Sequence, residues 1–282
     1  MQRKETTMYK KVLTLQDISC VGQCSLTVAL PILSACGMET VILPSAILST
    51  HTAGFKGFTF RDLTEDLDLI TDHWAKEGIS FDCFYTGYLG SLAQIDKALR
   101  ISKERLNEGA PFIVDPAMAD NGALYSIFDM EYVKAMKTLC DKADILLPNI
   151  TEAAFLTGME YKESYDEAYI KELVEKLTVN DRQIVVLTGV SYKKETTGVV
   201  VYQNGNLQYY EHKKIERGCH GTGDVYASAF VGALMNGKTP FDSAKIAADY
   251  TVSCIEYTQG DESHWYGVKF EPKLGYLIDL LK

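Results

Sequence analysis

Long apolar runs are missing from this sequence of 282 residues: no stretch approaches the roughly 20 apolar residues that span a bilayer. The charged N-terminus is not followed by the apolar core of a signal peptide. The seven cysteines are scattered, and no two of them have the Cys-x-x-Cys spacing of redox and metal sites. We therefore expect no contact with a membrane, reduced cysteines and a location in the cytoplasm.

Positive charge is also scarce. The chain has 28 Lys and Arg against 38 Asp and Glu, so its formal net charge is −10. Binding to nucleic acids depends on clustered Lys and Arg that contact phosphates, so this balance argues against a DNA or RNA partner. A phosphorylated small molecule is still compatible with the balance, because backbone N–H groups and a metal ion can bind it instead.

What the chain does have is a regular alternation of short apolar runs and amphipathic stretches. Its 46% hydrophobic and 23% charged residues are typical of a folded globular protein. Apolar strands that alternate with helices predict a parallel sheet covered on both faces. We expect strands at residues 12–15, 40–43, 83–86, 112–114, 145–147 and 184–187, and helices at 27–35, 64–76, 92–107, 130–142, 152–157, 165–176, 223–236 and 241–257.

One pair of strands breaks the alternation. Residues 198–202 and 207–210 flank Asn204-Gly205, and Asn-Gly between apolar runs is a hairpin signal, which predicts an antiparallel pair added to the sheet. No linker, repeat or low-complexity segment divides the sequence, so we expect one domain over residues 1–282. In open sheets of this kind the ligand binds beyond the carboxyl ends of the strands.

The most informative motif is Gly221-Thr222-Gly223-Asp224, which directly precedes a helix of small residues. Two glycines allow a tight turn, and the free N–H groups at a helix N-terminus bind anions. Asp224 lies in the first turn, where a carboxylate can take a proton from a substrate hydroxyl during phosphoryl transfer. The plainer alternative is a loop whose acid only stabilises the helix. The sequence has no Walker P-loop, so phosphate binding would depend on this loop.

This loop resembles the anion hole and catalytic aspartate of the ribokinase-like kinases. Three more segments follow that superfamily's order along the chain. They are Asp115-Pro116-Ala117-Met118, similar to its D-P-V-M segment, Asn149-Ile150-Thr151-Glu152, similar to its N-x-x-E magnesium motif, and Thr188-Gly189, similar to the strand end that meets the nucleotide phosphates.

Within the superfamily, the chain resembles the pyridoxal kinases. Residues 86–91 are similar to their S-G-Y-L-G-S segment, residues 49–52 to their S-N-H-T segment, and residues 15–22 to their first strand and glycine turn. Sugar kinases of the superfamily insert lid strands soon after the first strand, whereas here residues 22–35 run directly into a helix. The resemblance implies a three-layer ribokinase-like α/β sandwich, with a mostly parallel central sheet and no lid domain.

The activity implied by the resemblance is phosphorylation of the 5′-hydroxymethyl group of a B6 vitamer by ATP, in salvage of pyridoxal 5′-phosphate. The vitamer would contact Asp17, Ser45, His51, Tyr88 and Asp224, with Ser45 where the family commonly has a threonine. Asp224 would be the base, and the γ-phosphoryl group would be stabilised by Gly221, Thr222 and Gly223. Asp115 and Glu152 would act on Mg²⁺ through waters, and the nucleotide would be bound by Asp115, Asn149, Glu152, Thr188 and Gly189. A homodimer and assistance by K⁺ are implied by the resemblance alone.

Each of these side chains also has a plainer interpretation. Glu152 can balance the dipole of its helix, Asp115 can belong to a turn, and Tyr88 can be a core tyrosine at a strand end. His51 can be structural. At the place of Asp17 the pyridoxal kinases usually carry serine. Because a carboxylate prefers a cationic partner, we expect Asp17 to favour pyridoxamine, the alternative being an aspartate that caps the following turn.

Two other functions stay open. A hydroxymethylpyrimidine kinase of thiamine synthesis shares the lidless scaffold, although such enzymes often carry cysteine where Asp224 stands. A non-catalytic vitamer-binding protein could use the same fold, but it would need neither the loop at 221–224 nor the pair of Asn149 and Glu152.

Overall fold

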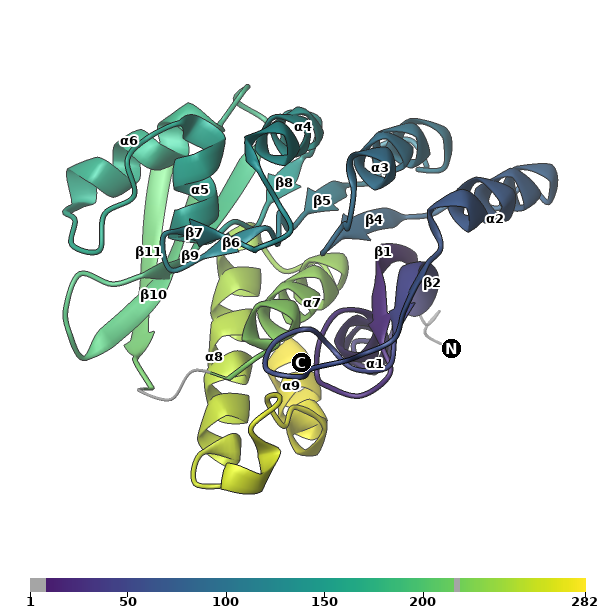
Figure 1. Cartoon of the computed structure of the whole chain (residues 1–282). Helices are drawn as coiled ribbons and strands as arrows, with labels where there is room; N and C mark the ends of the chain where they lie inside the picture. The colour runs from purple at the N-terminus through teal and green to yellow at the C-terminus, as the bar shows by residue number, and fades with distance from the viewer. Residues whose placement is uncertain (1–8, 216–218) are drawn as a thin grey trace, which may run out of the picture.

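The computed structural model describes residues 9–215 and 219–282, which are built around one nine-stranded sheet (Figure 1). The strand order is β11-β10-β9-β8-β5-β4-β1-β2-β3. The six central strands pair in parallel, and β10, β11 and β3 are antiparallel to their neighbours at the two edges. The strands are β1 (Lys11–Ser19), β2 (Glu39–Leu48), β3 (Phe60–Asp62), β4 (Cys83–Thr86), β5 (Phe112–Val114), β8 (Ile145–Leu146), β9 (Ile184–Val190), β10 (Thr196–Gln203) and β11 (Asn206–Lys213).

Helices cover both faces of the sheet and complete three layers (Figure 1). One face packs against α2 (Thr64–Lys76), α3 (Leu92–Glu104), α4 (Met130–Cys140), α5 (Ile150–Thr157) and α6 (Glu167–Leu177). The other face packs against α1 (Leu26–Ala35), α7 (Thr222–Met235), α8 (Pro240–Thr258) and α9 (Leu274–Leu281). Alternate residues of β1 enter the two cores, Leu13 on the first face and Val12 on the second, as the period of a strand requires. Within the described residues, none of these helices has the length and apolar character needed to cross a membrane.

The predicted parallel sheet and its antiparallel hairpin are confirmed. The strands predicted at 83–86 and 112–114 and the helix predicted at 64–76 match the structure residue for residue. The hairpin turns at Asn204 and Gly205, whose φ values of 51° and 76° give the doubly positive turn that suits twisted strands. After β1 the chain passes directly into α1, as expected for a scaffold that lacks the lid insertion at this point.

Several predicted boundaries were wrong. The strands predicted at 12–15 and 40–43 extend to Ser19 and Leu48, because polar residues at their carboxyl ends are buried in the fold. The helices predicted at 92–107 and 130–142 end earlier, at Glu104 and Cys140. Four short elements were missed: β3, the small pair β6 (Ala119–Asp120) and β7 (Ala123–Leu124), and α9. All three residues of β3 are exposed, so the strand shows no apolar pattern.

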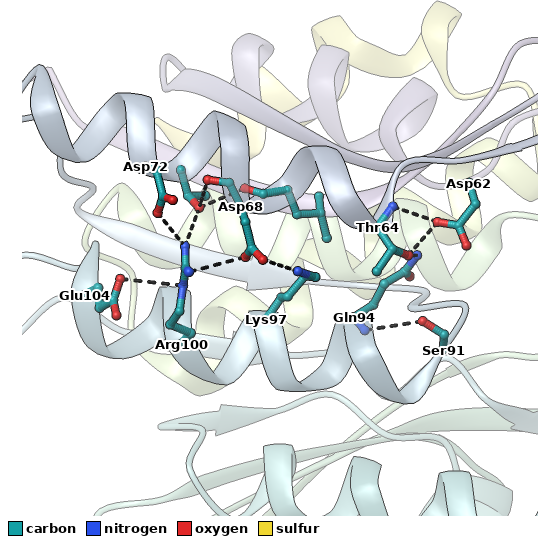
Figure 2. Close-up of polar contacts among 11 residues, drawn as sticks. Asp62, Thr64, Asp68, Asp72, Ser91, Gln94, Lys97, Arg100 and Glu104 are labelled. Atoms are coloured by element: carbon teal, nitrogen blue, oxygen red, sulfur yellow. Dashed lines mark hydrogen bonds and ion pairs between the residues drawn. The ribbon is translucent and has the colours of Figure 1, made fainter.

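Charged side chains join α2 to α3 on the outer surface, and Figure 2 shows how they meet. Arg100 of α3 lies 2.9 Å from a carboxylate oxygen of Asp72 and 3.4 Å from one of Asp68, and Lys97 also pairs with Asp68. At the inner end of the same helix, the amide of Gln94 donates to Thr64 at 2.9 Å and to the backbone carbonyl of Ser45 at 3.2 Å. The helix pair thereby anchors the carboxyl end of β2.

Candidate active site

The loop before α7 is held in a conformation that leaves its N–H groups free. Gly221 has a φ of +79°, and a Cβ at this position would lie 1.6 Å from the carbonyl oxygen of Gln23. Only glycine can therefore let this loop and the loop after β1 approach so closely. The first turn of α7 begins at Thr222, whose hydroxyl donates to the carbonyl of Cys219 at 3.3 Å. The first N–H groups of a helix have no partner within it, so this turn can bind an anion.

Asp224 is half-buried in the first turn of α7. The pKa of its carboxyl group is raised to about 7, mainly because the group is buried. The backbone of Ser25 opposes this shift, and the negative charge of Asp17 adds to it. A carboxylate with a pKa near neutrality is well suited to accept a proton from an alcohol and to release it later. The role of Asp224 as base stays a prediction, and this direction of the pKa shift is compatible with it.

Asp115 follows β5 and lies close enough to Glu152 and Asp224 for their charges to act on it. Burial raises the pKa of Asp115 well above its usual range, and the charges of Glu152 and Asp224 raise it further. The backbone N–H group of Ala117 donates to Asp115 at 3.2 Å and opposes this shift. The charges of Glu152 and Asp224 thus both act on Asp115, and a cation beside Asp115 would offset this repulsion.

Glu152 is 2% exposed and accepts hydrogen bonds on both carboxylate oxygens. One oxygen accepts the N–H group of Met118 at 3.0 Å, and the other accepts that of Asn149 at 2.9 Å. The side chain of Asn149 accepts the N–H group of Glu152 in return, which completes a capping box at the start of α5. Burial raises the pKa of Glu152 to about 7. The plainer interpretation thus holds in part, since Glu152 stabilises its helix and also braces the segment after Asp115.

The residues expected at the nucleotide come together at the ends of β8 and β9. Asn149 and Thr188 are bridge partners, and the N–H group of Thr188 donates to the carbonyl of Pro148 at 2.9 Å. Gly189 has a φ of +76° and turns the strand end, with the hydroxyl of Tyr165 lying 3.5 Å from its carbonyl oxygen.

Asp17 lies at a register shift of β1, where the pairing with β2 is interrupted between Gln16 and Ile18. Such shifts redirect side chains and are frequent beside active sites. The carboxylate is 5% exposed and accepts the hydroxyl groups of Ser25 at 2.6 Å and of Ser19 at 3.0 Å. Asp17 therefore ties the following turn together, as the alternative interpretation expected, while its charge still acts on Tyr88 and Asp224.

Tyr88 is half-buried after β4, with its ring 5.7 Å from that of Phe128. Burial raises the pKa of its hydroxyl to about 12, and the charge of Asp17 adds to the shift. Ser45, on β2, is fully buried, and its hydroxyl has no hydrogen-bond partner among the residues that the structure describes.

His51 has both ring nitrogens engaged by the backbone. Nε2 lies 2.5 Å from the carbonyl oxygen of Tyr266, and Nδ1 accepts the N–H group of Ala53 at 3.1 Å. With a proton on Nε2, the ring donates to Tyr266 and accepts from Ala53. The ring also packs against Gly22, where a Cβ would lie 2.1 Å from a ring carbon. A structural role for His51 is therefore present, and only its ring face remains to contact a ligand.

Two residues of the site were missed in the sequence. The hydroxyl of Ser25 donates to Asp17 at 2.6 Å, and Gln94 binds the backbone of Gly90 and Ser45. No motif signals either of them, because their partners are distant in sequence or are backbone groups.

A sequence model of the phosphomethylpyrimidine kinase family matches residues 33–267. The chain belongs to this family. It is 35% identical to a candidate phosphomethylpyrimidine kinase from Bacteroides thetaiotaomicron crystallised with pyridoxal, with a TM-score of 0.89 and 96% of each chain covered. It is 30% identical to pyridoxal kinase from Lactobacillus plantarum, and the two structures superpose with a TM-score of 0.89. The match covers 96% of this chain and 97% of that chain. Pyridoxal kinase of Dictyostelium discoideum is 27% identical over 245 residues, which are 80% of this chain and 78% of the relative.

Membership of this family confirms the resemblance that the motifs indicated. The match to solved structures over nearly the whole chain confirms the ribokinase-like fold. The chain is a kinase, as its relatives are. The donor groups beside Asp224 fit a hard divalent cation such as Mg²⁺, since they are carboxylate oxygens whose mutual repulsion a cation would relieve. Among the described residues no group of three His, Cys, Asp or Glu forms a direct metal cage, so most of the ligands of such a cation would be waters and phosphate oxygens.

Proposed function

We propose that this kinase transfers the γ-phosphoryl group of ATP to the 5′-hydroxymethyl group of a B6 vitamer and thereby salvages pyridoxal 5′-phosphate. The observation that supports the proposal is the position of Asp224 in the first turn of α7, just after Gly221, whose positive φ lets this loop approach the loop after β1. The charge of Asp17, which also acts on Tyr88, reaches Asp224 from the vitamer side. The charge of Asp224 in turn reaches Asp115 on the nucleotide side.

The mechanism follows from this placement. The ionised carboxylate of Asp224 accepts the proton of the substrate hydroxyl while that oxygen forms a bond to the γ-phosphorus, and ADP leaves with the electron pair of the broken P–O bond. The N–H groups of Gly221, Thr222 and Gly223 stabilise the charge on the transferred group. Asp115, braced through Glu152, would hold Mg²⁺ through waters, and the ion supplies positive charge for the phosphates.

The substrate is tested by ADP release with a panel of alcohols: pyridoxal, pyridoxamine, pyridoxine and hydroxymethylpyrimidine, each with ATP and Mg²⁺. We expect kcat/KM to be highest for one of the B6 vitamers, with pyridoxamine favoured because Asp17 carries a negative charge. A matched panel with Asp224→Asn reports any contaminating kinase. Tight binding of vitamers without ADP release would instead indicate a carrier, and that result would end the proposal.

A hydroxymethylpyrimidine kinase is the second candidate. It is favoured by the description of the family and of the Bacteroides relative. Tyr88 offers a ring for stacking on either heterocycle, so the ring alone does not discriminate between them. A kcat/KM for hydroxymethylpyrimidine above those of all three vitamers would select this function.

We further propose that the chain acts as one domain in a reducing compartment, the cytoplasm, and as a homodimer that is assisted by K⁺. Six of its cysteines, Cys20, Cys24, Cys36, Cys83, Cys140 and Cys254, are free thiols. The edge strand β3 pairs with β2 on one side only and presents Phe60, 57% exposed, and a second copy would cover this edge. Light scattering should give twice the chain mass, and Phe60→Glu should shift it toward the monomer. Replacement of K⁺ by Na⁺ should lower kcat.

A further inference from the structure

Gln94 lies in the first turn of α3 and is 1% exposed. Ser91 and Gln94 have the Ser-x-x-Gln spacing of a capping box, in which the glutamine side chain accepts the N–H group of the serine. Ser91 does accept the N–H group of Gln94, at 3.3 Å, but the side chain of Gln94 binds groups outside α3 instead (Figure 2). Capping of the helix therefore does not account for a buried glutamine at this position.

The side-chain amide of Gln94 connects three segments from different parts of the chain. Its oxygen accepts the N–H group of Gly90, in the turn after β4, at 2.7 Å. Its NH₂ group donates to the backbone carbonyl of Ser45 on β2 at 3.2 Å and to the hydroxyl of Thr64, at the start of α2, at 2.9 Å. These partners fix the orientation of the amide, because an N–H group can only donate and a carbonyl oxygen can only accept.

This link is important because β2 and β4 are not neighbours in the sheet. The strand β1 lies between them and pairs with both. Leu63 also donates to the carbonyl of Ser45, at 3.0 Å, but it follows β3, on the far side of β2 from β4. Tyr88 lies two residues before Gly90, and a Cβ on Gly90 would be 3.8 Å from its ring. Gln94 therefore joins the part of β2 that carries Ser45 directly to the turn that carries Tyr88.

We propose that Gln94 is a positioning residue that sets the spacing between Ser45 and Tyr88, the two side chains expected on either side of the substrate alcohol. The inference rests on the proposed function for this placement of Ser45 and Tyr88. The residues expected at the nucleotide, Asn149 and Thr188, lie at the ends of β8 and β9, on the other side of β5 from β4. Loss of the Gln94 amide should therefore weaken binding of the alcohol and leave binding of ATP unchanged.

The test compares Gln94→Met with Gln183→Met. Methionine keeps the length of the side chain and removes the amide. Gln183 is a matched control, because it is also 1% exposed and also makes three hydrogen bonds. Its oxygen accepts the N–H group of Val179 at 3.0 Å, and its NH₂ group donates to the carbonyls of Cys140 and Ala143, both at 2.9 Å. It directly precedes β9, at the amino end of the parallel strands, away from the expected site.

Steady-state kinetics are measured with the alcohol that the wild type uses best among pyridoxal, pyridoxamine, pyridoxine and hydroxymethylpyrimidine. In Gln94→Met we expect the KM for this alcohol to rise about tenfold, because the side chains that contact it are displaced, and the KM for ATP to stay as in the wild type. Gln183→Met should lower the Tm to a similar extent, since it also leaves backbone groups unpaired, but it should change neither KM.

Gln94→Glu is a second variant for the case that Gln94→Met does not fold. It keeps an oxygen for the N–H group of Gly90 and an acidic residue in the first turn of α3, but it removes both donors to Ser45 and Thr64. We expect the same division between the two KM values. The inference is overturned if the KM for the alcohol is unchanged, if both KM values rise together, or if Gln183→Met gives the same division.

Calorimetric binding of pyridoxal is measured in parallel, because it needs no turnover. A wild type that releases no ADP with any of the four alcohols would contradict the proposed function. In that case the Kd for pyridoxal replaces KM: a rise in Gln94→Met and none in Gln183→Met would still support the positioning role, and an equal Kd in wild type and Gln94→Met would end it.

Discussion

Asp224 is the proposed base, so its surroundings should set the pH at which phosphoryl transfer begins. Burial raises the pKa of its carboxyl group to about 7. The charge of Asp17 adds to this shift, and the backbone of Ser25 opposes it. A base acts in its ionised form, so kcat/KM should be low below pH 6, rise through about pH 7 and level off above it. A pH profile of ADP release from 5.5 to 9 checks this, and a flat profile would contradict it.

Asp224→Asn should lower kcat by about 100- to 10,000-fold while ADP binding persists.

Asp17 is the residue on which vitamer preference is expected to depend. Its carboxylate is bound by two serine hydroxyls, yet each oxygen can still accept another hydrogen bond. If Asp17 attracts the cationic aminomethyl group of pyridoxamine, Asp17→Ser should lower the ratio of kcat/KM for pyridoxamine over pyridoxal by roughly tenfold. Ser19→Ala, which loosens the same turn without removing the charge, serves as the control. An unchanged ratio in Asp17→Ser would mean that Asp17 only shapes the turn.

At the scale of elements, α7 carries the anion loop at one end and a second glycine at the other. Gly221→Ala would place a methyl group 1.6 Å from the carbonyl oxygen of Gln23, so the loop after β1 and the first turn of α7 must separate. We expect this variant to lose phosphoryl transfer and to have a lower Tm. Gly237 has a similar φ of +84°, but a methyl group added there would meet no neighbour within 4 Å, so Gly237→Ala isolates the backbone cost of about 1 kcal/mol.

Thermal melts and ADP release measured side by side distinguish the two glycines. Gly237→Ala should melt slightly earlier and keep its kcat, because its methyl group has open space around it. If Gly221→Ala behaved in the same way, the close approach of the two loops would have no part in catalysis.

Elements whose residues are contiguous could be predicted from the sequence, and contacts between distant residues could not. The helix α2 and the strand β4 are fixed by their own periodicity, and the loop of Gly221 and Asp224 is a continuous motif. Ser25 was missed because it meets Asp17 only when the turn after β1 has folded. The extension of β1 through Asp17 was missed because a buried polar strand end has no apolar pattern.

At the scale of the whole molecule, the net charge of −10 includes carboxylates that the fold gathers instead of separating. Asp17, Asp115, Glu152 and Asp224 come from four different strand ends or helices, and their pKa values are all raised, with burial as the largest cause. Since parallel strands bring their carboxyl ends to one edge, the topology itself concentrates this negative charge. If Mg²⁺ binds beside these carboxylates as proposed, the fold prepares its site at some cost to its own stability.

This cost predicts how stability depends on pH. Between about pH 4 and 7 the folded chain holds protons on these carboxyl groups that the unfolded chain has already released, so their contribution to the free energy of unfolding falls as pH rises. His220 acts in the opposite direction, because burial and the charge of His51 lower its pKa. The comparison is therefore made against Asp115→Asn, which keeps His220 and removes one charge of the cluster. Without Mg²⁺, the Tm of the wild type should fall relative to that of this variant between pH 5 and 8.

Mg²⁺ supplied with ADP should then raise the Tm of the wild type more at pH 8 than at pH 6, because at the lower pH protons compete with the cation for the same oxygens. In Asp115→Asn the gain should be smaller and should depend less on pH, since the pair of Asp115 and Glu152 is broken. Differential scanning calorimetry at both pH values measures the two gains directly. An equal gain at pH 6 and pH 8 in the wild type would mean that the cation binds elsewhere than beside these carboxylates.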